Sequence, residues 1–224
     1  MNQAEANQFN TRWETDISAH GRQLNRYPYP AFIGPFLLLF GRAPDRGKIN
    51  VLEVGCGAGN NIWFFAREGF ATHGIEGSAS ALAYAGGRLT AEGLTADLRH
   101  GNIQSLPFGD ETMDFILDRG SITHNTRPSI EATIDGVRRV LKPGGTFFSQ
   151  MFTTDHRDMT DGSASDFAGG YFAGIGRTFF ASRANLDQLF SSKFEIQSIE
   201  RESHENALTG HVSAVWNTMM RKTG

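Results

Sequence analysis

An apolar run that ends in three alternating glycines constrains this sequence more than any other feature. Residues 49–54 are mostly apolar, with Asn50 and Glu53 as the polar members. The run stops at Gly55, Gly57 and Gly59, and helix-compatible residues follow at once from Asn60. Glycine permits positive φ and lets a ligand approach the backbone closely, and the first N–H groups of a helix are free to bind polar groups. The pattern predicts a buried strand, a tight loop and a helix N-terminus that bind the polar end of a nucleotide-like molecule.

Strand-like and helix-like segments alternate from this loop onward. Strands are expected at residues 49–54, 71–75, 96–100, 113–117 and 146–152, and helices at residues 60–68, 79–92 and 128–141. Ser78 is expected to cap the second of these helices, and residues 142–145 are expected to be the turn that ends the third. The alternation implies a parallel sheet that is covered by helices on both faces and connected by right-handed crossovers.

The flanking segments are expected to complete a single domain around a ligand-binding core at residues 48–152. Residues 1–47 form a predicted helical cover, with helices at 9–24 and 31–40 whose aromatic side chains either pack on the core or lie over the ligand site. Residues 153–181 are rich in glycine and aromatic residues and are expected to form a lid or substrate loop. Residues 182–224 are expected to hold a helix capped by Ser182 and a hairpin with strands at 194–199 and 211–219.

The composition argues against several classes of partner. The net charge is −3 and the isoelectric point is about 6.2, which gives no general attraction to nucleic acid or to an anionic membrane. The single cysteine, Cys56, excludes an internal disulfide framework, and the N-terminus lacks the features of a secretory signal. The apolar stretch at residues 31–40 is too short to span a bilayer. We expect a cytoplasmic protein that binds neither nucleic acid nor membrane, and its oligomeric state, monomer or homodimer, stays open.

The spacing of the glycines distinguishes between the kinds of nucleotide that such a loop binds. A dinucleotide fingerprint requires a third glycine where Asn60 stands, and a phosphate-binding P-loop requires Gly-Lys-Ser/Thr, which is absent. Glu76 follows the second expected strand, 23 positions after Glu53, where a carboxylate accepts both hydroxyl groups of a ribose. A ribose-bearing ligand is therefore favoured, while a nicotinamide-dependent oxidoreductase stays open as an alternative function.

The glycine loop and Glu76, together with three later segments, make the sequence resemble the class I S-adenosylmethionine-dependent methyltransferases over residues 49–152. The matching segments are Glu53 to Gly59, Glu76, Gly101 to Ile103 with Leu106 to Phe108, Met113 to Asp118, and Leu141 to Gly145. The family more often has aspartate where this chain has Asn102, but an amide still exchanges hydrogen bonds with the adenine edge. The five segments occur in the family's order.

The resemblance implies a three-layer αβα Rossmann-like fold. Its seven-stranded sheet is mostly parallel, in the order 3-2-1-4-5-7-6, with strand 7 antiparallel. The resemblance also implies S-adenosylmethionine as cofactor and S-adenosylhomocysteine as product. The residues that it implies for cofactor binding are Glu53, Gly55, Cys56, Gly57, Gly59, Asn60, Glu76, Gly77, Asn102, Ile103, Asp118 and Arg119.

The reaction that the resemblance implies is in-line displacement at the sulfonium methyl group, in which the protein mainly positions the two reactants. His124 is the candidate general base and Asp118 a second candidate catalytic residue. The alternatives are a histidine that stabilises its loop and an aspartate that caps it. The candidate acceptor contacts are His20, Tyr27, His156 and Tyr171. Asp155 and His156 together with Asp118 are too scattered to make a metal motif, so no metal is predicted.

The acceptor is expected to be a small molecule. Members of this family that methylate the amino groups of nucleic-acid bases commonly carry Asn/Asp-Pro-Pro-Tyr/Phe after the fourth strand, where this chain has Asp118 to Ser121. The paired-glutamate loop of protein arginine methyltransferases is also missing. A sugar, a natural-product intermediate or another metabolite remains, with methylation on O, N, C or S left open. A methyltransferase-like binding protein without turnover is a further alternative.

Overall fold

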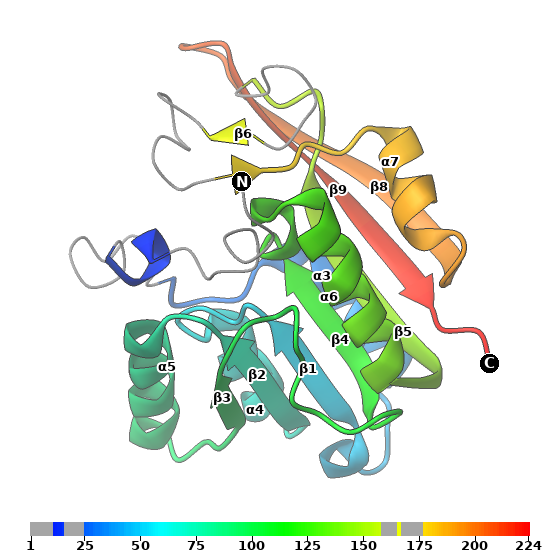
Figure 1. Cartoon of the computed structure of the whole chain (residues 1–224). Helices are drawn as coiled ribbons and strands as arrows, with labels where there is room; N and C mark the ends of the chain where they lie inside the picture. The colour runs from blue at the N-terminus through cyan, green and yellow to red at the C-terminus, as the bar shows by residue number, and fades with distance from the viewer. Residues whose placement is uncertain (1–10, 16–24, 158–164, 167–176) are drawn as a thin grey trace.

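The computed structural model describes residues 11–15, 25–157, 165–166 and 177–224. Its centre is a seven-stranded sheet in the order β3-β2-β1-β4-β5-β9-β8, with helices on both faces (Figure 1). The strands of this sheet are β1 (Asn50–Val54), β2 (Ala71–Glu76), β3 (Asp97–His100), β4 (Met113–Arg119), β5 (Leu141–Phe152), β8 (Glu195–Asn206) and β9 (His211–Arg221). The α-helices are α3 (Pro30–Phe40), α4 (Asn60–Arg67), α5 (Ala79–Ala91), α6 (Arg127–Val140) and α7 (Arg183–Phe190), and the short 3-10 helices are η1 (Arg46–Lys48) and η2 (Ile122–His124).

Strand pairing confirms the topology that the resemblance implied. β1 pairs in parallel with β2 and β4, β2 pairs in parallel with β3, and β4 pairs in parallel with β5. β9 is antiparallel to both β5 and β8, so the order is 3-2-1-4-5-7-6 when the strands of this sheet are numbered along the chain. The strand order reverses between β1 and β4, which is where open α/β sheets form a ligand crevice.

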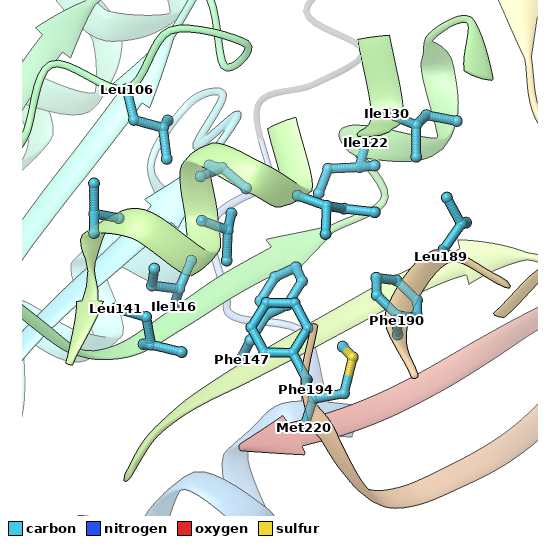
Figure 2. Close-up of a cluster of buried hydrophobic side chains, with 14 of the residues drawn as sticks. Leu106, Ile116, Ile122, Ile130, Leu141, Phe147, Leu189, Phe190, Phe194 and Met220 are labelled. Atoms are coloured by element: carbon cyan, nitrogen blue, oxygen red, sulfur yellow. The ribbon is translucent and has the colours of Figure 1, made fainter. Parts of the chain in front are cut away.

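The two faces of the sheet bury separate clusters of apolar side chains. On the face covered by α6 and α7, Phe147 of β5 packs against Phe190 and Phe194, with ring centroids 6.2 and 5.8 Å away (Figure 2). On the face covered by α3 and α4, Phe36 packs against Phe115 of β4 at 4.9 Å between ring centroids. Burial on both faces explains why the central strands read as nearly continuous apolar runs.

Local capping signals determine where the helices begin. Ser78 caps α5 as predicted, because its hydroxyl accepts a 3.1 Å hydrogen bond from the N–H of Ala81. Ser182 caps α7 in a reciprocal arrangement with Asn185. Pro30 occupies the first turn of α3, where its missing N–H group leaves no helical hydrogen bond unmade. The predicted starts of these helices are confirmed for this reason.

The turn predicted at residues 142–145 lies inside β5 and not before it, so the predicted start of this strand is wrong. β5 already pairs with β4 at Leu141, and after an irregularity the pairing resumes at Thr146. Gly144 has a φ of 76° within this bulge, and its N–H donates a 2.9 Å hydrogen bond to the carbonyl of Lys222. The bulge is held by the far end of the chain, which no local pattern could indicate.

The C-terminal hairpin is longer than predicted. β8 was expected to end at residue 199 but continues to Asn206, which pairs with His211 at the start of β9. Residues 200–206 are almost all polar or charged and lack the apolar alternation of a half-buried strand. Figure 1 shows the reason, since this part of the hairpin projects beyond α7 and the core.

The segment predicted as a lid, residues 153–181, is described only in part. β6 (Ser165–Asp166) and β7 (Arg177–Thr178) pair antiparallel, and the chain after β7 joins η2. There the N–H of Phe179 donates to the carbonyl of Thr123 at 2.7 Å, and the Thr123 hydroxyl donates to the carbonyl of Phe179 at 2.6 Å. Residues 158–164 and 167–176 are not among those the structure describes, so the lid stays a prediction.

Candidate functional site

The glycine loop joins β1 to α4 at the carboxyl edge of the sheet. Gly55, Gly57 and Gly59 have φ values of 70°, 51° and 76°, a conformation that side chains other than glycine rarely adopt. A Cβ at Gly55 would come within 2.1 Å of the Ser121 hydroxyl, and one at Gly59 within 2.7 Å of Ala85. At Gly57, no atom of the described residues lies within 4 Å of the place that a Cβ would occupy. Packing requires the outer two glycines, whereas the middle one leaves space for a ligand.

Glu76 ends β2 and directs its carboxylate at the same loop. Oε2 accepts a hydrogen bond from the N–H of Gly57, and Oε1 accepts one from the N–H of Ser78, each at 2.9 Å. Burial raises the pKa of Glu76, and these backbone donors oppose that shift. The backbone therefore holds the carboxylate in place, while each oxygen keeps a lone pair for another donor.

Glu53 of β1 is a buried acid with an unused oxygen. Its Oε1 accepts a 2.6 Å hydrogen bond from the amide of Asn61, whereas Oε2 is buried and has no hydrogen-bond partner among the described residues. Burial raises the pKa of Glu53 to about 8, and the Asn61 bond and the charge of Arg119 oppose this only partly. An unpaired buried polar atom costs free energy. Oε2 is thus a candidate contact for a cationic or hydrogen-bond-donating group of a ligand.

Arg119, at the end of β4, stacks on Tyr29, a residue that the sequence prediction missed. The guanidinium carbon is 3.2 Å from the centroid of the Tyr29 ring, and the N–H of Tyr29 donates to Asn61 at 3.1 Å. The predicted residue, Tyr27, is 69% exposed and contacts Trp63 of α4, with ring centroids 6.4 Å apart. The only local signal for Tyr29 was its place directly before the proline that starts α3, which favours extended backbone there.

Asp118 is fully buried and caps the loop that follows β4. Oδ1 accepts hydrogen bonds from the N–H groups of Ser121 and Ile122 at 2.9 and 3.0 Å, and Oδ2 accepts one from the Ser149 hydroxyl at 2.8 Å. Burial raises the pKa of Asp118 to about 6 against these hydrogen bonds. The carboxylate has no exposed surface. This geometry agrees with the alternative that Asp118 caps its loop, and it does not support the predicted catalytic role of Asp118.

His124 lies in η2, is partly buried and contacts aromatic rings from other parts of the chain. Its Nδ1 is 2.9 Å from the Thr178 hydroxyl, and its ring centroid is 5.0 Å from that of Trp13 and 5.7 Å from that of Phe152. Burial, with a smaller contribution from the charge of Arg119, lowers the pKa of His124 to about 3. The ring is neutral at physiological pH, but such a weak base accepts a proton poorly. The role of general base stays a prediction, and the geometry favours a positioning role.

Two other predicted cofactor residues of the loop are occupied by protein contacts. Cys56 is buried with Ile62 and Leu89, and burial raises the pKa of its thiol well above the ordinary value, so the side chain is a neutral packing group. Asn60 donates its side-chain amide to the carbonyl of Tyr27 at 3.1 Å. In the described geometry both side chains support the loop.

The remaining predicted cofactor residues lie in the loops after β2 and β3. The carbonyl of Gly77 accepts a 2.9 Å hydrogen bond from His100, which joins the two loops. Asn102 accepts a 3.0 Å hydrogen bond from the N–H of Gln104, and Ile103 packs partly buried against the core. These residues keep the loop after β3 beside Glu76, as the predicted adenine contact requires.

A row of polar side chains continues from Arg119 across the sheet. Gln150 of β5, in register with Arg119, donates to Asn217 of β9 at 2.8 Å, and Asn217 donates to Glu202 of β8 at 3.0 Å. A carboxylate only accepts hydrogen bonds, so Glu202 sets the orientation of both amides and turns the carbonyl of Gln150 away from Asn217. The sequence gave no signal for this row because its members come from four strands.

The predicted acceptor contacts are only partly tested by the geometry. His20 and Tyr171 fall in ranges that the structure leaves undescribed. His156 is buried, with its ring centroid 5.1 Å from Phe152 and 5.6 Å from Phe180. Asp155 pairs with Arg201 at 2.7 Å. Acceptor binding by His156 and Tyr27 therefore stays a prediction.

Within the described ranges, 11–15, 25–157, 165–166 and 177–224, no group of three or more His, Cys, Asp or Glu side chains is placed to hold a metal ion. No helix in those ranges is long and apolar enough to cross a membrane.

The residues that build this edge of the sheet lie in a segment that matches a known family model. A family model described as a methyltransferase domain matches residues 51–145, which include the glycine loop, Glu76 and Asp118. Over these residues the chain is similar to the methyltransferase family. Its fold is shared with a S-adenosylmethionine-dependent methyltransferase from Methanosarcina mazei, at a TM-score of 0.70 and 20% identity over 88% of this chain and 99% of that one.

Curated relatives match the methyltransferase domain over part of their length. An uncharacterised methyltransferase from Synechocystis sp. is 33% identical over 97 residues, which is 43% of this chain and 44% of that protein. A ubiquinone biosynthesis O-methyltransferase from Chelativorans sp. is 30% identical over 113 residues, which is 49% of this chain and 44% of that protein. The chain spans less than half the length of each of these relatives.

Proposed function

We propose that this protein transfers the methyl group of S-adenosylmethionine to a small-molecule acceptor, such as a sugar, a natural-product intermediate or another metabolite. The observation that carries the proposal is the open space at Gly57, beside the anchored carboxylate of Glu76. Glu53, on the strand that leads into this loop, has an oxygen without a hydrogen-bond partner among the described residues. The family of the domain supports methyl transfer, and S-adenosylmethionine is the methyl donor that this family implies.

The residues at this edge match the chemical groups of the cofactor. Glu76, held by two backbone N–H groups, suits the ribose hydroxyls. The unpartnered oxygen of Glu53 suits the ammonium group at the amino-acid end of the cofactor. Arg119 is close enough to lower the pKa of Glu53 and suits the carboxylate at the same end. Asn102 remains the expected adenine contact.

When bound, the cofactor supplies an activated methyl carbon, so the protein has to bind and orient the two reactants and exclude water. Orientation of this kind contributes up to about 7–11 kcal/mol in favourable cases. His124, with a pKa of about 3, is better suited to form a surface against which the acceptor packs than to remove a proton from the acceptor. The carbonyl of Gln150 suits an O–H or N–H group of the acceptor.

The expected acceptor combines an apolar part with a polar one. Phe152 and His124 offer aromatic surface, while Gln150 of the adjoining strand offers an amide. One relative is a ubiquinone biosynthesis O-methyltransferase, which is consistent with a small acceptor. The chain matches less than half of the length of that relative, so the name of the relative does not identify the acceptor of this chain.

Cofactor binding is the first test, because it separates the proposal from the oxidoreductase alternative. Thermal unfolding is followed with S-adenosylhomocysteine and with NAD in parallel samples. We expect S-adenosylhomocysteine to stabilise the protein, by about 2.7 kcal/mol at a hundred times its dissociation constant, and NAD to have no effect. Stabilisation by NAD alone would show that the proposal is wrong.

Turnover is the second test, because it separates an enzyme from a binding protein. The protein is incubated with methyl-labelled S-adenosylmethionine and a panel of metabolites that carry hydroxyl, amine, thiol or activated carbon groups. Labelled product together with S-adenosylhomocysteine is the expected result for at least one acceptor, and the Gly57→Val variant serves as the background control. Binding of S-adenosylhomocysteine without product from any acceptor would favour the binding-protein alternative.

A further inference from the structure

A short helical stretch near the N-terminus, residues 12–15, reaches both walls of the cofactor site. We refer to it as the cover segment. Figure 1 shows it in blue beyond the end of α5, and it is the described part of the predicted N-terminal helix at residues 9–24. Its contacts with the walls of the site come from two consecutive residues, Trp13 and Glu14.

Glu14 binds the first turn of α5. Ser78 donates its hydroxyl to Oε2 of Glu14 at 2.6 Å, and Ser80 donates both its hydroxyl and its N–H, the latter at 3.3 Å, to the same carboxylate. These hydrogen bonds hold the pKa of Glu14 below its ordinary value. α5 has no acidic residue in its own first turn, so Glu14 supplies from elsewhere in the chain the negative charge that a helix N-terminus favours.

Trp13 contacts the opposite wall of the site. Its ring meets the ring of His124 edge-on, with 5.0 Å between the centroids. His124 belongs to η2, which follows β4, whereas α5 follows β2, and in the sheet β1 lies between these two strands. Because Trp13 and Glu14 are neighbours in the chain, the cover segment crosses from one wall to the other over the glycine loop that leaves β1.

Space for a ligand remains between the cover segment and the loop. The position at Gly57 where a side chain would begin has no described atom within 4 Å. Ser78 connects the two acids beside this space, since its N–H binds Glu76 and its hydroxyl binds Glu14. A ligand held by Gly57 and Glu76 therefore has the cover segment on its outer side.

We propose that the cover segment encloses the bound cofactor and that Glu14 is the positioning residue that keeps it closed. This inference rests on the proposed function. Release of S-adenosylhomocysteine then requires the hydrogen bonds from Ser78 and Ser80 to Glu14 to open. Trp13 moves with them, so opening also removes one wall of the space in front of His124, and cofactor exchange and access of the acceptor are coupled.

A role for Glu14 in capping α5 alone leads to a different expectation. Loss of a cap lowers the melting temperature of the unliganded protein and leaves the rate of cofactor release unchanged. Loss of a closing contact raises the rate of release. The two roles are separated by measuring both quantities on the same variants.

The experiment measures the dissociation rate of S-adenosylhomocysteine by stopped flow, with tryptophan fluorescence as the signal. Glu14→Gln removes the charge and keeps the shape, and Glu205→Gln is the matched control, since Glu205 is exposed on β8 in the hairpin. We expect Glu14→Gln to release the ligand about tenfold faster, because charge-assisted hydrogen bonds to the cover segment become neutral ones. Ser80→Ala is expected to change the rate in the same direction, and Glu205→Gln to leave it unchanged.

The outcomes distinguish this inference from the proposed function. Failure of the wild-type protein to bind S-adenosylhomocysteine would overturn the proposed function and the inference with it. Normal binding with an unchanged release rate in Glu14→Gln, whatever its melting temperature, would overturn the inference alone. Faster release in Glu14→Gln, with Ser80→Ala adding nothing further in the double variant, would show that the two residues act through one contact.

Discussion

The two sides of the candidate site are built from different kinds of contact. On the side formed by the glycine loop, Glu76 and the start of α5, which we call the cofactor side, backbone groups hold the polar atoms. Both oxygens of Glu76 accept hydrogen bonds from backbone N–H groups, and the loop depends on glycines at positive φ. Backbone contacts of this kind leave little freedom to rearrange.

On the side formed by η2 and the adjoining parts of β4, β5 and β9, which we call the acceptor side, side chains contact side chains. Arg119 stacks on Tyr29, and Gln150 is oriented by Asn217. A single substitution changes such a contact without changing the backbone. The comparison suggests that the cofactor side serves one ligand, whereas the acceptor side can be adapted to different acceptors on the same fold.

Gly57→Val is the strongest way to break this comparison. A β-branched side chain at Gly57 enters the space assigned to the cofactor, so we expect affinity for S-adenosylhomocysteine to fall below detection in calorimetry. The positive φ of 51° also costs about 1–2 kcal/mol of stability. Gly69→Val is the matched control, because Gly69 has a φ of 86° at the end of α4 and no described atom within 4 Å of its Cβ position. Equal loss of affinity in both variants would mean that strain, and not the filled space, is responsible.

Glu53→Gln tests the buried acid at the border of the two sides through the pH dependence of stability. The pKa of Glu53 is about 8 in the folded chain, against an ordinary value of 4.5. Between these values the folded chain keeps a proton that the unfolded chain releases, so the free energy of unfolding falls as pH rises, by at most about 1.4 kcal/mol per unit. Urea denaturation of the wild-type and Glu53→Gln proteins between pH 5 and pH 8 should show this slope in the difference between their free energies of unfolding. A difference that does not change with pH would contradict the raised pKa of Glu53.

The same variant tests the proposed contact between Glu53 and the ammonium group of the cofactor. A nearby cation favours the ionised carboxylate, so binding of S-adenosylhomocysteine near pH 7 should release a proton from Glu53. Calorimetry in two buffers of different ionisation enthalpy measures that release. We expect it in the wild-type protein and not in Glu53→Gln, and equal proton release in both would place the ammonium elsewhere.

The cofactor side was predictable from the sequence because its signals are local. The glycines at positions 55, 57 and 59, the cap at Ser78 and the acid at Glu76 each sit at a short, characteristic distance from a strand end. Strand order followed from the resemblance and from right-handed crossovers. These features needed no knowledge of contacts between distant segments.

The acceptor side and the cover segment were not predictable because their contacts join distant residues. Glu14 and Ser78 are 64 positions apart, and Gln150 and Asn217 are 67 positions apart. No periodicity encodes such pairs, and no local pattern indicates that Tyr29 lies over Arg119. Asp118 is predicted from the sequence as a cofactor-binding and catalytic residue, whereas the structure turns its carboxylate into the loop that follows β4.

Substitution of Asp118 asks whether this residue belongs to the scaffold or to the chemistry. Asparagine can still accept from Ser121 and Ile122 and can donate to Ser149, so Asp118→Asn should keep the fold and the affinity for S-adenosylhomocysteine. Asp118→Ala leaves buried donors unpaired and should cost about 1–3 kcal/mol in chemical denaturation. A stable Asp118→Asn protein that binds the cofactor but gives no product would instead restore the catalytic interpretation.

The smallest expected effect concerns His124, because we predict that its imidazole ring does not change its protonation state between pH 5 and pH 8. With a pKa of about 3, its ring should stay neutral from pH 5 to pH 8, so its imidazole NMR signals should not move over that range. The chain has seven histidines, and the His124→Gln variant identifies the signals of His124 among them. The cause of the shift can be tested as well, since burial and not the hydrogen bond to Thr178 lowers the pKa, so Thr178→Val should leave the ring neutral. A midpoint near the ordinary value would show that water reaches the ring, and His124 would then be available as a base. A flat profile would mean that His124 helps to place the acceptor against the methyl group and does not remove its proton.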